Sequence, residues 1–204
     1  MTAQVLTVIL NYRTAEMTLR AAEAALRAME GVAGAITIVD NDSQDGSFET
    51  MARAAADWPR VQVLQAGRNG GFGAGNNVGI RAGLPGGARP DFVYLLNSDA
   101  FPAPDAIAAL LHHMQAHPGL GFAGSYIHGP EGEPHVTAFR FPSIASEFEG
   151  AARTGPITRL LRRHVVPLPV PAESGRVDWL AGASVMMRQD MLDEVGLFDE
   201  RFFL

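Results

Sequence analysis

Residues 36–47 read Ile36-Thr37-Ile38-Val39-Asp40-Asn41-Asp42-Ser43-Gln44-Asp45-Gly46-Ser47, so that a short β-branched run ends abruptly in acids, amides and hydroxyls. The run at 36–39 lacks a clear alternation of polar and apolar residues, which is typical of a strand buried on both faces of a parallel sheet. The segment that follows, residues 47–56, is rich in residues that favour a helix. One strand, one polar turn and one helix are therefore predicted in this order.

The same pattern is repeated along the first half of the chain. Apolar runs at 6–10, 61–64 and 92–96 predict three further strands, and residues 14–29 and 104–117 predict helices. Strands that alternate with helices form βαβ units with right-handed crossovers. We therefore predict an α/β fold, Rossmann-like and three-layered, with a mostly parallel central sheet between two layers of helices.

The second half of the chain is less regular. Residues 122–126 and 135–141 are candidate strands, and residues 189–195 are a predicted helix. Residues 177–187 predict a strand or a hairpin around a bend of small residues. Residues 142–176 contain Pro, Gly and Arg without a clean period, so no element is predicted there.

The composition excludes several kinds of chemistry. The 204 residues include 0 Cys, which excludes disulfides, thiolate nucleophiles and Cys-bound zinc. All 16 basic residues are Arg, so neither a Schiff-base Lys nor the Lys of a Walker phosphate loop is present. The net charge of −6 argues against a nucleic-acid partner. No apolar run approaches the ~20 residues of a membrane span, and no basic region precedes the first apolar run as in a signal peptide.

Polar residues follow the end of each predicted strand. They are Asn11-Tyr12, residues 40–43, residues 68–77 and Asn97-Ser98-Asp99. Ligands of open parallel sheets bind beyond the carboxyl ends of the strands, so these segments predict one shared binding crevice. Asp99 can supply a carboxylate oxygen to Mg²⁺ or Mn²⁺, with a diphosphate and water as the other ligands. The structural alternative is that residues 97–99 form a turn capping the helix that begins near Pro104.

The glycine-rich segment Gly71-Phe72-Gly73-Ala74-Gly75 suggests an alternative function. It resembles the loop of an S-adenosylmethionine-dependent methyltransferase, but it follows the third strand, whereas such loops usually follow the first. It does not match the dinucleotide-binding pattern, because Asn76 replaces the third glycine. We expect a loop that either needs positive φ angles and close packing or lets a nucleotide approach the backbone.

Six ordered segments of the chain form a recognisable set. They are residues 8–12 (Val8-Ile9-Leu10-Asn11-Tyr12), 38–47, 69–79 (Asn69-Gly70-Gly71-Phe72-Gly73-Ala74-Gly75-Asn76-Asn77-Val78-Gly79), 94–100, 179–183 and 195–204. In this order they resemble the family 2 glycosyltransferases with the GT-A fold, and in particular their rhamnosyltransferase-like branch. The resemblance covers nearly the whole chain except residues 142–176.

The resemblance implies a role for each matching residue on the side of the nucleoside. Asp40 would accept a hydrogen bond from the pyrimidine base, with Asn11, Tyr12 and Asp42 lining the nucleoside pocket. Arg68 and Asn76 would lie near the ribose or the diphosphate.

The resemblance also implies a metal site and an acceptor side. Asp99 matches the last acid of the family's D-x-D motif and would bind the cation, Mg²⁺ or Mn²⁺, while Asn97 replaces the first acid. Trp179, Gly182 and Ala183 would shape the acceptor side. Residues 1–204 would then be a single GT-A-type domain, in which residues 1–118 bind the nucleotide sugar and residues 119–204 form the acceptor-side half, incomplete at its C-terminal end.

The implied reaction is a single inverting displacement. It moves a sugar such as rhamnose from a UDP- or dTDP-linked donor to a glycan or lipid-linked acceptor, whose hydroxyl a carboxylate deprotonates. In the family that base belongs to an aromatic-x-Glu-Asp motif directly after the segment matching Phe202-Phe203-Leu204, where this sequence ends. We therefore expect nucleotide binding with negligible transfer, and a binding-only fragment is the alternative.

Three further features bear on metals, partners and location. His113 and His117 lie four residues apart on a predicted helix, but Met114 and the lack of a third ligand favour a solvent-facing helix end over a zinc site. The stretch 153–171, with Arg159, Arg162 and Arg163, predicts either an ordinary connecting helix and loop or peripheral membrane contact near a lipid-linked acceptor. The resemblance implies a cytoplasmic location, at or near the inner face of the membrane. Exposed Phe202 and Phe203 would favour a homo-oligomer.

Overall fold

The computed structural model describes residues 2–152, 154–170 and 173–203. Arg153 and Pro171, at the two ends of the Arg-rich stretch, and Leu204 of the last matching segment lie outside the described residues. The chain forms two compact units, which we call unit 1 (Met1–Ala123 with Gly182–Leu204) and unit 2 (Gly124–Ala181). Within the described ranges, no helix is long and apolar enough to cross a membrane.

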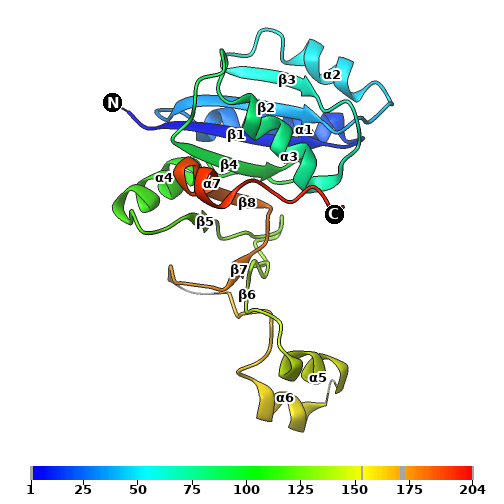
Figure 1. The fold of residues 1–204 in the computed structure, drawn as a ribbon, viewed down its shortest axis with the longest axis vertical. Helices are drawn as coiled ribbons and strands as arrows, with labels where there is room; N and C mark the ends of the chain where they lie inside the picture. The colour runs from blue at the N-terminus through cyan, green and yellow to red at the C-terminus, as the bar shows by residue number, and fades with distance from the viewer. Residues whose placement is uncertain (1, 153, 171–172, 204) are drawn as a thin grey trace. The chain divides into compact units, whose positions relative to one another are not determined.

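Unit 1 is built on a six-stranded, mostly parallel sheet (Figure 1). The strand order is β3-β2-β1-β4-β8-β5, in which β1 is parallel to both β2 and β4, β2 is parallel to β3, and β8 is antiparallel to β4. The predicted α/β fold with a mostly parallel sheet is thus confirmed. The strands are β1 (Gln4–Asn11), β2 (Ala33–Asp40), β3 (Val61–Gln65), β4 (Phe92–Asn97), β5 (Phe122–Gly124) and β8 (Ser184–Arg188).

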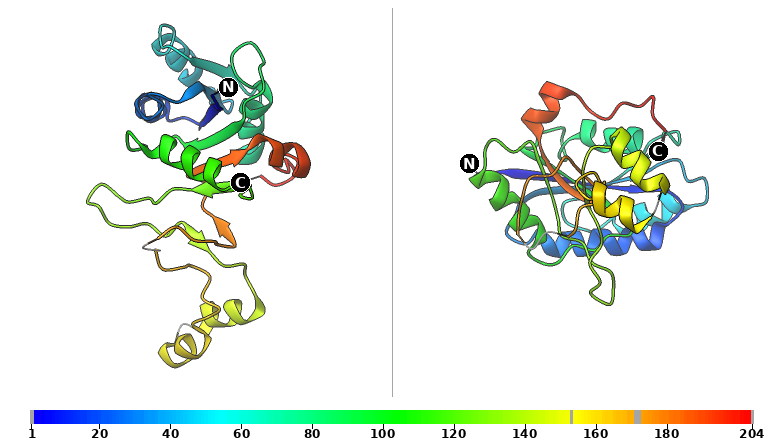
Figure 2. Two further views of the ribbon diagram at one scale, coloured as in Figure 1. Left: turned by 90° about the vertical axis from the view of Figure 1, so that its left-hand side faces the viewer. Right: turned by 90° about the horizontal axis from the view of Figure 1, so that it is seen from below.

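Helices cover both faces of this sheet, as the right-hand view of Figure 2 shows. One face packs against α1 (Ala15–Ala28), α2 (Ser47–Ala54) and α4 (Ala106–Ala116), and the other against α3 (Gly71–Ala82) and α7 (Gln189–Val195). Alternate residues of each strand point to opposite faces, so Val5 and Ile9 of β1 belong to one core cluster and Leu6 and Val8 to the other. Because both faces are covered, the strands carry apolar residues almost continuously.

The glycine-rich segment was expected to be a loop, and this expectation is wrong. Residues 71–82 form helix α3, which begins with Gly71 at a φ of +79°. A Cβ on Gly75 would lie 2.4 Å from Cδ1 of Leu10, and a Cβ on Gly79 would lie 2.6 Å from Cγ1 of Val8. The glycines therefore let the helix lie close against β1, and this packing outweighs the low helix propensity of glycine.

The carboxyl ends of the parallel strands meet at one edge of the sheet. The register pairs Asn11 with Asp40, Leu10 with Asn97, and Asp40 with Gln65. The polar residues that follow the strands are thus brought to the same edge, as the sequence pattern predicts for a parallel sheet.

Unit 2 contains little regular structure. Strands β6 (Ala138–Phe139) and β7 (Trp179–Leu180) form an antiparallel pair, and helices α5 (Ile144–Ala152) and α6 (Gly155–Leu161) pack against each other. Helix α5 falls where the sequence predicted no element, whereas α6 falls in the stretch 153–171, for which a connecting helix and loop was one of the two alternatives. Their apolar residues have no clean helical period because few of them are buried, with Ser146 the only buried residue of α5 and none in α6 among those described.

Residues 177–187 do not form a hairpin. Trp179-Leu180 pairs with β6 in unit 2, whereas Ser184–Arg188 pairs with β4 in the large sheet. The small residues between them separate two strands that belong to different sheets. A bend is therefore present, but it does not lie within one strand.

Candidate functional site

A pocket of about 410 Å³ opens at the carboxyl edge of the unit 1 sheet. It collects residues from the ends of β1 and β4, from the start of α3 and from the segment that follows α7. Its lining residues are Leu10, Tyr12, Thr14, Asn41, Asn69, Gly71, Phe72, Asn97, Ser98, Asp99 and Phe203. Three of the residues predicted from the sequence, Tyr12, Asn97 and Asp99, therefore line one pocket.

Asp99 lies on a short turn directly after β4. Its side chain is exposed, and no residue in the described part of the chain makes a hydrogen bond or ion pair with its carboxylate. The turn is held by the backbone, because Asn97 N donates to Ala183 O at 2.9 Å and Ala100 N donates to Asn97 O at 3.1 Å. Helix α4 begins only at Ala106, with Asp105 at its N-cap position, so Asp99 does not cap this helix.

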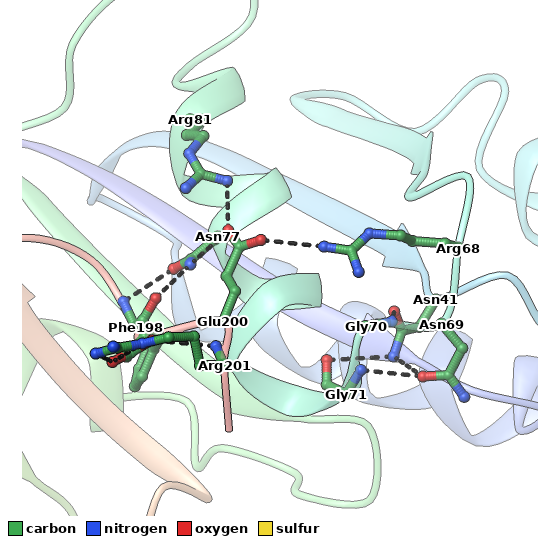
Figure 3. A network of polar contacts seen from close by, with 11 residues as sticks. Asn41, Arg68, Asn69, Gly70, Gly71, Asn77, Arg81, Phe198, Glu200 and Arg201 are labelled. Carbon is green, nitrogen blue, oxygen red and sulfur yellow. Dashed lines mark hydrogen bonds and ion pairs between the residues drawn. The ribbon is translucent and has the colours of Figure 1, made fainter. Parts of the chain in front are cut away.

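Two asparagines fix the beginning of α3 at the pocket. Asn41 Nδ2 donates to Asn69 Oδ1 at 2.9 Å and to Gly71 O at 3.3 Å, and its Oδ1 accepts from Gly70 N at 3.3 Å (Figure 3). Gly71 N also donates to Asn69 Oδ1 at 3.1 Å. These bonds leave the first turn of α3 facing the pocket, and the N-terminus of a helix favours anions.

Behind the pocket, Asp40 and Asn11 form a buried polar network with Ser43. Asp40 Oδ1 accepts from Asn11 Nδ2 at 2.7 Å and from Ser43 Oγ at 2.6 Å, and Oδ2 accepts from Ser43 N at 3.0 Å. All three residues are fully buried. Asp40 and Asn11 are not among the residues that line the pocket, so a contact between Asp40 and a base requires neighbouring side chains to move.

Three other predicted residues are engaged elsewhere in unit 1. Asp42 accepts from Gln44 Nε2 at 2.9 Å, and Asn76 is turned back onto its own helix, donating to Phe72 O at 2.9 Å. Arg68 forms an ion pair with Glu200, with Nη2 and Oε2 3.3 Å apart. None of the three lines the pocket.

The residues predicted for the acceptor side fall in both units. In unit 1, Gly182 lies under the ring of Phe72, since a Cβ on it would be 3.4 Å from Cζ, and Ala183 O accepts from Asn97 as described above. In unit 2, Trp179 stacks on Phe139 with ring centroids 4.0 Å apart, and its Nε1 donates to Arg140 O at 2.9 Å.

A second hollow, of about 500 Å³, lies between the starts of α1 and α2. It is larger than the first pocket but contains none of the predicted site residues. Its charged lining mixes both signs, with Arg13 and Arg20 beside Glu16 and Asp45. The smaller pocket has a free carboxylate, aromatic rings and amides together, and we regard it as the better candidate for a binding site.

The prediction from sequence missed several residues of the pocket. Asn41 and Asn69 were recognised as parts of motifs but were not assigned to the site, and Phe72 was expected to lie on a loop. Phe203 reaches the pocket from a segment more than 100 residues away in the sequence, which no local pattern could indicate.

The chain has an α/β fold with a pocket at the carboxyl edge of its sheet, and a comparison with known families identifies the class. The family described as "Glycosyl transferase family 2" matches residues 6–173. The chain therefore belongs to glycosyltransferase family 2. The match extends over most of residues 142–176, which the ordered motifs had not covered, and the family assignment replaces the methyltransferase alternative.

The chain is also similar to a characterised enzyme. It is 30% identical over 185 residues to N-acetylglucosaminyl-diphospho-decaprenol L-rhamnosyltransferase of two Mycobacterium tuberculosis strains. The alignment covers 83% of this chain and 57% of the relative, so the chain spans little more than half of the relative's length.

Solved structures with the same fold have low sequence identity to this chain. The mannosyltransferase PcManGT from Pyrobaculum calidifontis, in complex with GDP-Man and Mn²⁺, gives a TM-score of 0.61 at 16% identity, covering 98% of this chain and 48% of that chain. Residues 1–349 of S. aureus TarS give 0.63 at 14% identity, covering 98% and 52%, and the same protein in complex with UDP gives 0.61 at 15% identity, covering 97% and 51%. These structures confirm the GT-A-like fold.

Proposed function

We propose that the pocket lined by Tyr12, Asn69, Asp99 and Phe203 binds the nucleoside diphosphate part of a nucleotide sugar. The observation that carries this proposal is the convergence of Tyr12, Asn97 and Asp99 on one pocket in a member of glycosyltransferase family 2. The name of the M. tuberculosis relative supports rhamnose as the transferred sugar. We propose a UDP- or dTDP-linked donor because the sequence motifs resemble those of the rhamnosyltransferase-like branch.

The nucleoside would lie at the Tyr12 side of the pocket. Tyr12 is 41% exposed, and Arg13 lies over its ring with Cζ 5.0 Å from the ring centroid, so one ring face is supported while the side chain still lines the pocket. A base can stack on such a ring. Asp40 Oδ2, which accepts a single hydrogen bond from the described residues, would accept from the base.

The diphosphate would lie between the first turn of α3 and Asp99. Asp99 is an oxygen ligand without a described partner, and Asn97 and Ser98 offer further oxygens beside it, which suits Mg²⁺ or Mn²⁺. Among the described residues no group of three or more His, Asp or Glu could hold a metal ion, so the diphosphate and water would have to complete the shell. Such a cation offsets the charge that develops on the leaving diphosphate.

We infer an inverting displacement whose base is not Asp199. The pKa of Asp199 is held below its ordinary value by hydrogen bonds from Arg201. A general base works best with a pKa near the operating pH, and the lowered pKa of Asp199 opposes that role. The binding-only alternative predicts the same nucleotide binding without transfer.

We propose a glycan or lipid-linked acceptor, because the M. tuberculosis relative is named for an acceptor on a decaprenol diphosphate. Helix α6 supports peripheral contact with a membrane at the cytoplasmic face. Its residue Leu160 is 82% exposed, and Arg159, Arg162 and Arg163 beside it are also exposed. Arginines flanking an exposed apolar side chain suit an anionic lipid surface. Self-association through Phe202, which is 65% exposed and does not line the pocket, and through the exposed part of Phe203 is the proposed route to an oligomer.

A thermal-shift panel tests the proposed function. UDP, dTDP and GDP, each with Mn²⁺ or EDTA, are compared with S-adenosylmethionine. We expect stabilisation by a pyrimidine nucleoside diphosphate with Mn²⁺, because a ligand that binds only the folded state raises the unfolding temperature. Stabilisation by S-adenosylmethionine alone would reject the proposal.

A further inference from the structure

The segment after α7 is attached to α3 by side-chain hydrogen bonds. Asn77 Nδ2 donates to Phe198 O at 2.8 Å, and Phe198 N donates to Asn77 Oδ1 at 3.1 Å, although the two residues are 121 positions apart (Figure 3). Asn77 is fully buried. Its side-chain amide forms the two hydrogen bonds that the backbone N–H and C=O of Phe198 would otherwise form with a neighbouring strand or within a helix. Residues 198–203 are therefore anchored at their first residue.

Glu200 adds a second attachment two residues further along. Its Oε1 accepts from Asn77 Nδ2 at 3.0 Å and from Arg81 Nη1 at 2.7 Å, and its Oε2 lies 3.3 Å from Arg68 Nη2. The hydrogen bonds from Asn77 and Arg81, in this order, hold the pKa of Glu200 below its ordinary value. Exposed ion pairs alone contribute little to the stability of a folded protein. Here the two arginines pair with a carboxylate that also accepts from the buried amide of Asn77, so the contacts form one network. We call the contacts among Asn77, Arg81, Phe198 and Glu200 the α3 clasp.

The clasp connects to the pocket through aromatic side chains. Phe198 packs edge to face against Phe72, with ring centroids 6.0 Å apart and planes at 77°. Gly73 allows this approach, since a Cβ there would lie 3.0 Å from the Cβ of Phe198. Phe72 lines the pocket, and so does Phe203 at the other end of the clasped segment.

We propose that Asn77 and Glu200 are positioning residues that seat residues 198–203 on α3, so that Phe198 supports Phe72 and Phe203 closes one side of the nucleotide pocket. That the pocket binds a nucleotide rests on the proposed function. That residues 198–203 are held against α3 does not depend on it. Neither Asn77 nor Glu200 lines the pocket, so each acts through the two phenylalanines.

The absence of cysteine from the sequence allows a direct test of the seating. Cysteines introduced by Ser98→Cys and Phe203→Cys lie in the lining of the same pocket, one on the turn after β4 and one on the clasped segment, and are to be joined by a short bis-maleimide. We expect efficient cross-linking in the otherwise unchanged chain and a several-fold lower yield after Glu200→Ala or Asn77→Ala. Glu200→Gln keeps an acceptor for Asn77 but loses both ion pairs, so its yield should be intermediate.

Arg89→Ala is the matched control. It removes an exposed ion pair with Asp193 of α7 that is not part of the clasp, and it should leave the yield unchanged. The unfolding temperature of each variant shows whether it is folded, and Glu200 is the safer position because its side chain is 30% exposed whereas Asn77 is buried. An unchanged yield in folded Glu200→Ala would overturn the proposed seating.

Binding of UDP with Mn²⁺ to chains without the added cysteines tests the effect on the pocket. Glu200→Ala should raise the Kd several-fold, and Arg89→Ala should not. A lower cross-linking yield with an unchanged Kd would overturn the claim that the clasp shapes the pocket. If the parent chain binds no nucleotide, the proposed function fails while the cross-linking yield still decides the seating.

Discussion

Asn11 and Asp40 lie on neighbouring parallel strands, where Asn11 Nδ2 donates to Asp40 Oδ1 at 2.7 Å and neither residue is exposed. Asn11 Oδ1 in turn accepts from Thr18 Oγ1 of α1 at 2.8 Å. The ends of β1 and β2 and the start of α1 are thus joined by side chains before any ligand binds. The network lies next to lining residues Tyr12 and Asn41 in the sequence, and mutations in it test both stability and binding.

Asp40→Asn should destabilise the chain by about 2 kcal/mol. An amide places an N–H₂ group where a carboxylate oxygen now accepts from Asn11 or Ser43, and a buried donor left without an acceptor costs about 1–3 kcal/mol. Urea unfolding measures the change. Asp42→Asn is the control, since Asp42 accepts only from Gln44 among the described residues and Asn tolerates its φ of +58°. Equal effects of the two substitutions would contradict the buried-network assignment.

Nucleotide binding by the Asp40→Asn variant shows whether Asp40 contacts the base or only stabilises the fold. We expect Asp40→Asn to weaken nucleoside binding with and without metal, because its proposed partner is the base. Unchanged affinity in folded Asp40→Asn protein would mean that Asp40 only supports the pocket.

Asp99→Asn should abolish the metal-dependent part of nucleotide binding and leave the fold intact. The substitution removes a charged oxygen ligand but disturbs no hydrogen bond among the described residues. The ratio of the Kd of UDP in EDTA to that in Mn²⁺ is the quantity to measure. The same ratio in the parent and the variant would reject Asp99 as the metal ligand.

Acid should loosen the α3 clasp. The folded-state pKa of Glu200 is below its ordinary value of 4.5, so its ionised form stabilises the clasp above that pH, and this contribution is lost as the pH falls through the lowered pKa. Arg68 and Arg81 face the carboxylate and keep their charge, and the adjacent Asp199 pairs with Arg201. A spin label at Phe203→Cys should become mobile in this acidic range.

Glu200→Gln gives the control for this titration. The label should then be more mobile at neutral pH and should lose its pH dependence in the same range, while circular dichroism shows whether the domain stays folded. An identical pH profile in Glu200→Gln would assign the titration to another carboxylate.

Much of unit 1 could be predicted from the sequence because its signals are local. The apolar runs and the polar residues after β1, β2 and β4 define a parallel sheet and its carboxyl edge, and Asp99 lines a pocket at that edge. Helix α3 was missed because its glycines have a low propensity for helix, which the local sequence shows. The close contact of the helix with Leu10 and Val8, which favours it, depends on the tertiary structure.

The partner of Asn77 and Arg68 could not be predicted because it is distant in the sequence. Both side chains donate to Glu200, which lies 123 and 132 residues further along the chain. In unit 2, α5 and α6 bury so few apolar residues that no amphipathic period marks them.

Helix α6 should bind anionic lipid. We expect the chain to sediment with vesicles containing phosphatidylserine and to do so less with neutral vesicles. The double substitution Arg162→Gln and Arg163→Gln should weaken this binding about tenfold or more, since each arginine near an anionic surface contributes about 1 kcal/mol. Arg27→Gln with Arg53→Gln removes the same charge from exposed positions in unit 1 and should have little effect. Equal losses in both double variants would indicate attraction by charge alone.

Calorimetric titration of UDP and dTDP in the presence of Mn²⁺, into the parent chain and into Tyr12→Ala, tests the nucleotide pocket most directly. At least one of the two should bind with one-to-one stoichiometry, and Tyr12→Ala should weaken it roughly tenfold or more, as the loss of base stacking on an aromatic ring does. Tyr126→Ala, which removes an exposed tyrosine of unit 2, should leave the affinity unchanged. Saturable binding that is equal in the parent and in Tyr12→Ala, or no binding of either nucleotide with Mn²⁺, would contradict the proposed pocket.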